Sequence, residues 1–148
     1  MNISEHFSLE EMTFSETAAR LGIDNAADPE IVANLKCVAA LMEKVRALLG
    51  KPITVHSGYR APRVNEAVGG VATSAHCFGL ACDFVCGQYG TAAEVALAIL
   101  KSELEYDQLI LEYGWVHIGL AKEGTRPRRE ALTKRSPRAP YELGIRAF

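Results

Sequence analysis

The chain has 148 residues, a hydrophobic share of 49% and a charged share of 23%, values typical of a soluble globular protein. Its length suits one domain, 1–148, that can bury a core without disulfides or repeats. No apolar run approaches the roughly 18 residues that span a bilayer, so we expect no membrane insertion. The opening residues, Met1 to His6, lack the basic and apolar regions of a signal peptide.

The net charge of −2 is unevenly distributed. Residues 1–120 carry 8 Lys and Arg against 15 Asp and Glu, whereas residues 121–148 carry 8 against 3. This basic C-terminal segment suits an anionic polymer such as cell wall, but a solvated surface segment, packed on the domain or trailing it, is the simpler interpretation. No base-reading motif accompanies the charge, so nucleic acid is not an expected partner.

Four cysteines are present: Cys37, Cys77, Cys82 and Cys86. Their number allows two disulfides, but reduced thiols fit better with the lack of a secretory signal. The last three are spaced C-x4-C-x3-C, without the C-x2-C pairs of a structural zinc site. We therefore expect them to act as small buried side chains.

Helix signals dominate the first half of the chain. Ser8 to Glu11 has the S-x-x-E form of a capping box and predicts a short helix. Asp28-Pro29 and the apolar spacing that ends at Gly50 predict a long amphipathic helix over 29–49. A strand over 53–56 and a loop-rich stretch, broken at Gly69-Gly70, follow.

Short strands dominate the second half. The pattern predicts a strand over 80–86, a helix from the capping box at 91–94 to about residue 102, and strands over 108–112 and 115–120. The last two meet across Tyr113-Gly114 as a hairpin. The fold class is therefore α+β, with a central, mainly antiparallel sheet and N-terminal helices.

Three polar side chains are candidate metal ligands, two of them because of strand alternation. Asp83 is the charged residue of the strand 80–86 and lies on the face opposite its apolar residues, and His117 lies likewise on the strand 115–120. His76 precedes the first of these strands. Two imidazoles and one carboxylate suit zinc with a position left for water. Spacing alone, however, favours ordinary hydrogen-bonded polar residues over a metal site.

Three sequence blocks resemble a known family: Ser57-Gly58-Tyr59-Arg60, Ser74-x-His76-x-x-Gly79-x-Ala81-x-Asp83, and Trp115-Val116-His117. They look like the blocks of the zinc D-Ala-D-Ala carboxypeptidase and L-alanyl-D-glutamate endopeptidase family, whose fold is shared with hedgehog signalling domains. The resemblance covers nearly the whole chain. The segments 4–12 and 49–53 also resemble its small phage and prophage endolysin-like branch.

The resemblance implies a role for each matched residue. His76, Asp83 and His117 would hold Zn²⁺. Arg60 would stabilise the substrate carbonyl as it becomes an oxyanion, and Ser74 would hydrogen-bond the substrate peptide. Trp115 is either part of the substrate cleft or a packing residue, and the sequence favours neither.

The general base departs from the family pattern. In better-known members the catalytic carboxylate lies three residues before the last histidine, where this chain has Gly114. The nearest acid is Glu112, which a tight turn would fold back beside His117. Asp107 lies about five residues further down the strand, roughly 16 Å away. We therefore predict Glu112 as the base.

These features predict a zinc-dependent peptidoglycan peptidase that hydrolyses an amide bond of the cell-wall stem peptide, in the role of a phage or prophage endolysin. The alternatives are a D-Ala-D-Ala carboxypeptidase and a non-hydrolytic zinc-binding or phage structural module. We expect a monomer, made in the cytoplasm of a host bacterium, that reaches the wall after release through a membrane lesion such as a holin makes.

Overall fold

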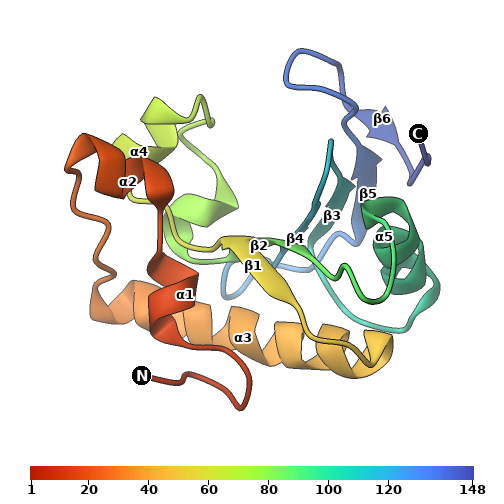
Figure 1. Cartoon of the computed structure of the whole chain (residues 1–148), viewed down its shortest axis with the longest axis horizontal. Helices are drawn as coiled ribbons and strands as arrows, with labels where there is room; N and C mark the ends of the chain where they lie inside the picture. Colours follow the sequence, from red (N-terminus) through yellow and green to blue (C-terminus); the bar gives the residue numbers. More distant parts are fainter.

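The computed structural model describes residues 1–148 and contains one six-stranded sheet with helices around it (Figure 1). The helices are α1 (Leu9–Thr13), α2 (Glu16–Leu21), α3 (Pro29–Leu49), α4 (Pro62–Ala67), the 3-10 turn η1 (Ala75–Phe78) and α5 (Ala92–Lys101). The strands are β1 (Thr54–Ser57), β2 (Ala81–Val85), β3 (Gln108–Leu111), β4 (Val116–Gly119), β5 (Glu130–Thr133) and β6 (Glu142–Leu143). None of the helices is long and apolar enough to cross a membrane.

The helix boundaries follow the capping signals in the sequence. Ser8 and Thr91 each form a complete capping box at the start of α1 and α5. The Asp28 side chain accepts a hydrogen bond from the first turn of α3, and Gly50 ends that helix in the left-handed conformation. The three helices expected from sequence are therefore confirmed.

The sheet has the strand order β1-β2-β4-β3-β5-β6. Every neighbouring pair is antiparallel except β3 and β5, which are parallel. The hairpin expected across Tyr113-Gly114 joins β3 to β4. The predicted α+β class with a mainly antiparallel sheet is confirmed.

One face of this sheet builds the core against α3 and α5, which lie on the same side of it (Figure 1). The strand residues in the core cluster are Cys82, Phe84, Leu109, Leu111, Val116 and Ile118. They meet the buried side of α3, which contributes Leu35, Val38, Ala39, Leu41, Met42, Val45 and Leu49. Each fully buried aliphatic side chain stabilises the fold by about 1.5–3 kcal/mol. The alternate residues of the strands therefore stand on the opposite face, away from the core.

Two parts of the chain differ from expectation. The stretch after β1, expected to be loop-rich, contains the short helix α4 and the turn η1. The basic segment 121–148 does expose most of its charged side chains, but its backbone forms β5 and β6 and extends the sheet. β6 has only two residues, and the alternation in β5 is masked by the many charged residues around it.

Candidate metal centre

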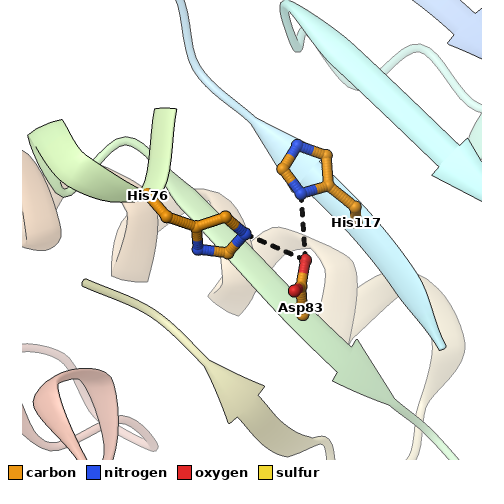
Figure 2. A group of neighbouring side chains, drawn as sticks. All are labelled: His76, Asp83 and His117. Carbon is orange, nitrogen blue, oxygen red and sulfur yellow. Dashed lines mark hydrogen bonds and ion pairs between the residues drawn. The ribbon is translucent and has the colours of Figure 1, made fainter. Parts of the chain in front are cut away.

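Asp83 and His117 face each other across two paired strands. They are direct register partners in the β2–β4 ladder. Their chain neighbours Cys82, Phe84 and Ile118 are all in the core, so alternation turns Asp83 and His117 to the opposite face. His117 Nδ1 lies 2.9 Å from Asp83 Oδ1 (Figure 2). The face predicted for both residues is the one observed.

His76 reaches the same point from η1. The Ser74 hydroxyl caps this turn by accepting a hydrogen bond from the His76 backbone N–H, and Gly79 ends it with a φ of 69°. His76 Nε2 lies 3.1 Å from the same Asp83 oxygen. The three side chains are buried, and one potential ligand atom from each lies within 4.8 Å of the others.

The hydrogen bonds of His76 show that the cluster fits a cation. Its Nδ1 lies 2.6 Å from the carbonyl oxygen of Gly58, which can only accept, so Nδ1 carries the proton. In the neutral ring Nε2 then carries a lone pair, which faces the Asp83 carboxylate. Two acceptors in contact require a positive charge between them. A bond from the other ring nitrogen to a carbonyl is also the usual support of a metal-bound histidine.

The donor set and its spacing suit zinc. Two imidazoles and one carboxylate leave the fourth position of a tetrahedral site open, as catalytic zinc requires. Bonds of about 2.0–2.2 Å place tetrahedral ligand atoms about 3.4 Å apart, so the observed contacts need to open by about half an ångström. Cys82 lies on the core face and is not part of the group, and all four cysteines are free thiols.

The charge state of Asp83 agrees with this role. Burial alone would raise the pKa of the Asp83 carboxyl, but His76 and His117 outweigh burial and hold that pKa well below its ordinary value. The group is therefore an anion in the folded protein. A buried carboxylate between two imidazoles is ready to bind a divalent ion without first losing a proton.

The segment Ser57-Gly58-Tyr59-Arg60 holds the cluster together through its backbone. A side chain at Gly58 would lie 2.3 Å from the carbonyl oxygen of Met12, so glycine is needed for this close approach. The Gly58 carbonyl orients the His76 ring, and the Arg60 N–H donates to the His76 carbonyl oxygen over 3.0 Å. This motif therefore places a ligand as well as a cation.

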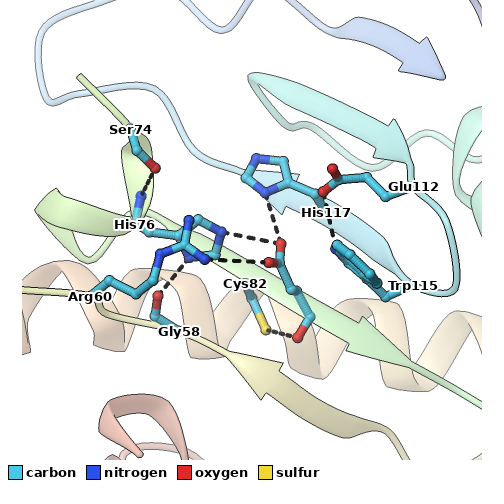
Figure 3. Close-up of polar contacts among 9 residues, drawn as sticks. Gly58, Arg60, Ser74, His76, Cys82, Glu112, Trp115 and His117 are labelled. Carbon is cyan, nitrogen blue, oxygen red and sulfur yellow. Dashed lines mark hydrogen bonds and ion pairs between the residues drawn. The ribbon is translucent and has the colours of Figure 1, made fainter. Parts of the chain in front are cut away.

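The Arg60 guanidinium lies beside the ligands. Its Nη1 is 4.0 Å from Asp83 Oδ2, and its buried Nε has no hydrogen-bond partner (Figure 3). Arg60 lines the cleft, so its guanidinium can donate to an oxygen of a ligand that enters the site. The arrangement is compatible with the oxyanion role predicted for Arg60, which stays a prediction.

Glu112 follows the last residue of β3 and lies in the turn before β4. The Glu112 N–H donates to the Trp115 carbonyl, and Gly114 takes a φ of 122° that other residues rarely adopt. The carboxylate accepts a hydrogen bond of 3.0 Å from Trp115 Nε1 (Figure 3). Burial raises the pKa of Glu112 and the Asp83 charge raises it further, while His117 acts in the opposite direction. The turn thus brings Glu112 into the electrostatic field of the cluster.

Asp107, the rival carboxylate, is engaged elsewhere. It accepts three hydrogen bonds from Arg128, one from the backbone N–H and two from the guanidinium. The Arg128 guanidinium lowers the pKa of Asp107. A carboxylate with a low pKa and these partners is poorly suited to remove a proton from water.

A cleft of about 1250 Å³ runs over this face of the sheet. The three candidate ligands, Arg60, Ser74, Glu112 and Trp115 all line it. Its lining residues come from distant parts of the chain: residues 68–71 follow α4, and Pro137 and Tyr141 lie between β5 and β6. The side chain of Trp115, whose role was left open, lies in the cleft and also contacts Tyr113. The hydroxyl of Ser74 caps η1, and its predicted contact with substrate stays a prediction.

The C-terminal part of the cleft floor, formed by residues of the segment 130–143, was not expected from the sequence. Leu132, Lys134 and Tyr141 line it together with Ile110 of β3. The one signal for them is the alternation from Glu130 to Lys134, which points Glu130, Leu132 and Lys134 to a single face. That signal is hidden by the high charge of the surrounding segment.

A buried His-Asp-His cluster that opens to a cleft and has an arginine and a carboxylate beside it defines a mononuclear metallohydrolase type of site. The profile of the family described as Peptidase M15 matches residues 5–119. The chain therefore belongs to this family, that of the zinc D-Ala-D-Ala carboxypeptidases, and is a metallopeptidase by descent. No curated protein matches the chain significantly.

Proposed function

We propose that the protein is a zinc-dependent peptidase that hydrolyses an amide bond in the stem peptide of bacterial peptidoglycan. The observation that carries the proposal is the convergence of His76, Asp83 and His117 on one point of a long cleft in a chain of the M15 family. A peptide substrate needs an extended cleft of this kind, with the reacting bond at the ligand cluster.

The proposed mechanism assigns one task to each residue near the cluster. Zinc, when held there, supplies a Lewis acid that acidifies water and polarises the scissile carbonyl. Glu112 takes the proton of the attacking water and passes it to the leaving amine. Its raised pKa suits both steps, because the carboxylate must first gain and then lose that proton. Arg60 stabilises the negative charge that develops on the carbonyl oxygen, and Trp115 holds Glu112 in place.

The role of an endolysin is the finer part of the proposal. Its support is the resemblance of segments 4–12 and 49–53 to the small phage and prophage branch. A protein in this role is made in the host cytoplasm and reaches the wall through a membrane lesion. Expression of the chain in a bacterium, with and without a holin, tests this: lysis is expected only with the holin, and lysis without it would contradict the role.

Two alternatives have specific support. A carboxypeptidase uses the same cluster on a terminal D-Ala. A non-hydrolytic zinc-binding or phage structural module is favoured by Gly114, because the better-known members that this chain resembles have the catalytic carboxylate at that position.

Mass analysis of fragments from purified peptidoglycan and defined stem peptides separates all three. An endopeptidase releases fragments cut within the stem, and a carboxypeptidase removes single alanines. A binding module releases nothing, and that result, obtained with zinc-loaded protein, would overturn the proposal.

A further inference from the structure

Residues after the family match complete the floor of the cleft. Strand β5 pairs in parallel with β3, so that Ile110 lies opposite Leu132 and Leu111 opposite Thr133. The Lys134 N–H donates to the Leu111 carbonyl over 2.8 Å, and Leu111 is the residue before Glu112. This bond holds the backbone of Lys134 beside the predicted general base.

A single row of residues crosses the sheet from the cluster to the C-terminal strands. The strand registers align, one after another, Asp83, His117, Ile110, Leu132 and Leu143. With strands about 4.8 Å apart, the row extends about 14 Å beyond His117. The cleft floor therefore changes from metal-binding groups to an apolar strip. Leu143 at its far end is 76% exposed, although a leucine is usually buried.

Lys134 stands beside this strip as a cation that forms no ion pair within 4.0 Å, although its charge acts on the nearby Glu112 carboxyl and lowers the pKa of that group. Arg60 and Arg128, which also line the cleft, lie within 4.0 Å of Asp83 and Asp107 respectively. The Lys134 ammonium instead donates to the Ala139 carbonyl over 2.9 Å and lies 4.3 Å from the centre of the Tyr141 ring. It is half-buried, whereas Lys122 and Arg126 of the cleft are exposed.

These contacts fix the ammonium and leave donors unused. An ammonium has three N–H groups, and one is taken by Ala139. A cation already held in place loses little side-chain freedom when an anion binds to it. The ligand that matches it is a carboxylate, which would accept the remaining hydrogen bonds.

We propose that residues 130–143 form a substrate subsite in which Lys134 binds a free carboxylate of the peptide, while Ile110, Leu132 and Leu143 contact its apolar part. This inference rests on the proposed function for the identity of the peptide, since peptidoglycan stems carry several free carboxylates. It assigns substrate selection to a segment that lies outside the family match at residues 5–119.

The test measures binding without turnover. Glu112→Gln protein, loaded with zinc, is titrated with a synthetic stem peptide that contains diaminopimelate, and with versions in which each free carboxylate is amidated in turn. Trp115 is the single tryptophan of the chain and lines the cleft, so its fluorescence reports occupancy. Lys134→Met and Lys134→Arg are compared in this background, with Lys44→Met as the matched control. Lys44 is exposed on α3 and does not line the cleft.

Lys134→Met is expected to raise the Kd of the free peptide about ten- to a hundredfold, as loss of a charged hydrogen bond does. One particular carboxylate of the peptide should be the partner of Lys134. Amidation of that carboxylate should raise the Kd for the parent protein by a similar factor, and Lys134→Met should then cause no further change in the Kd. Lys134→Arg should retain most of the affinity, and Lys44→Met should match the parent. An equal loss for the free and all amidated peptides would show that Lys134 only supports Tyr141, and would overturn the inference, as would no loss at all.

Cleavage by the unsubstituted protein separates this inference from the proposed function. If the peptide binds through Lys134 in a carboxylate-dependent way but is not cleaved, the subsite is supported and the proposed peptidase function is contradicted. If the peptide is cleaved but its Kd does not change in Lys134→Met, the peptidase function is supported and the subsite is contradicted. Failure of every stem peptide to bind would contradict both.

Discussion

The two ends of the residue row across the sheet are built in different ways. At the ligand end, Asp83 and His117 project from strands whose other face is buried against α3 and α5. At the C-terminal end, β5 and β6 are fastened by hydrogen bonds, among them those of the buried Thr133 hydroxyl to Gly144 and Arg146. Core packing tolerates little change, whereas an edge held by polar contacts can vary at small cost. The proposed chemistry therefore lies where geometry is fixed, and the proposed selectivity lies where the sheet can be altered.

The largest effect should come from the ligand end. His117→Ala removes one of three candidate ligands and leaves Asp83 with less compensation for its buried charge. We expect zinc binding and peptidase activity to be lost and the melting temperature to fall. His56→Ala, an exposed histidine on β1, is the control and should bind zinc and cleave as the parent does. Equal zinc content in both variants would mean that the cluster is not the metal site.

The next largest effect should come from Glu112. Glu112→Gln keeps the side-chain shape and an oxygen that accepts from Trp115, but it cannot take a proton. We expect kcat to fall by about 10²- to 10⁴-fold with zinc content unchanged. Asp107→Asn, at the rival carboxylate, should cost little activity. A reversal of the two results would move the base to Asp107, and full activity in both would require a base elsewhere.

Arg60 should have a smaller effect at the same end of the row. Arg60→Ala removes a cation that lines the cleft near Asp83. We expect kcat to fall by about 10²-fold or more while zinc is retained. Arg63→Ala, an exposed arginine on α4, controls for the loss of charge and should be neutral. If Arg60→Ala keeps the kcat of the parent, Arg60 has no role in catalysis and only forms an ion pair with Asp83.

The smallest effect should come from the C-terminal end. Thr133→Val keeps the shape but leaves the Gly144 carbonyl and the Arg146 N–H without their partner. We expect unfolding free energy to fall by about 1–3 kcal/mol and KM to rise, with zinc content and kcat nearly unchanged. Thr125→Val, in an exposed loop, should lie within about 0.5 kcal/mol of the parent. A loss of zinc from Thr133→Val would show that the two ends are not independent.

The sequence predicted those parts of the molecule that local chemistry determines. The N-cap residues Ser8, Asp28 and Thr91 predict the starts of helices. Their side chains accept hydrogen bonds from free N–H groups of the first turn, and this interaction does not depend on where the helix packs. The faces of Asp83 and His117 follow from alternation alone, because their neighbours are apolar. Their assignment to zinc, in contrast, came from resemblance, since spacing did not favour it.

The remainder depends on contacts between distant residues. Nothing local in Gly58 indicates that its carbonyl orients His76, because that bond joins residues 18 positions apart in the chain. The alternation in β5 is masked by the charges around it, and β6 has only two residues. Both strands depend on distant pairing, because β5 pairs with β3 and β6 pairs with β5. The wall of the cleft that carries Lys134 could therefore not be derived from the sequence.

The central claim is that a zinc ion at His76, Asp83 and His117 cleaves peptidoglycan stems. The most direct measurement is the release of stem-peptide fragments, detected by mass, from purified peptidoglycan by protein that has been stripped of metal and then reloaded with zinc. We expect no release by the stripped protein and restored release at one zinc per chain. Full release by protein shown to contain no metal would contradict it.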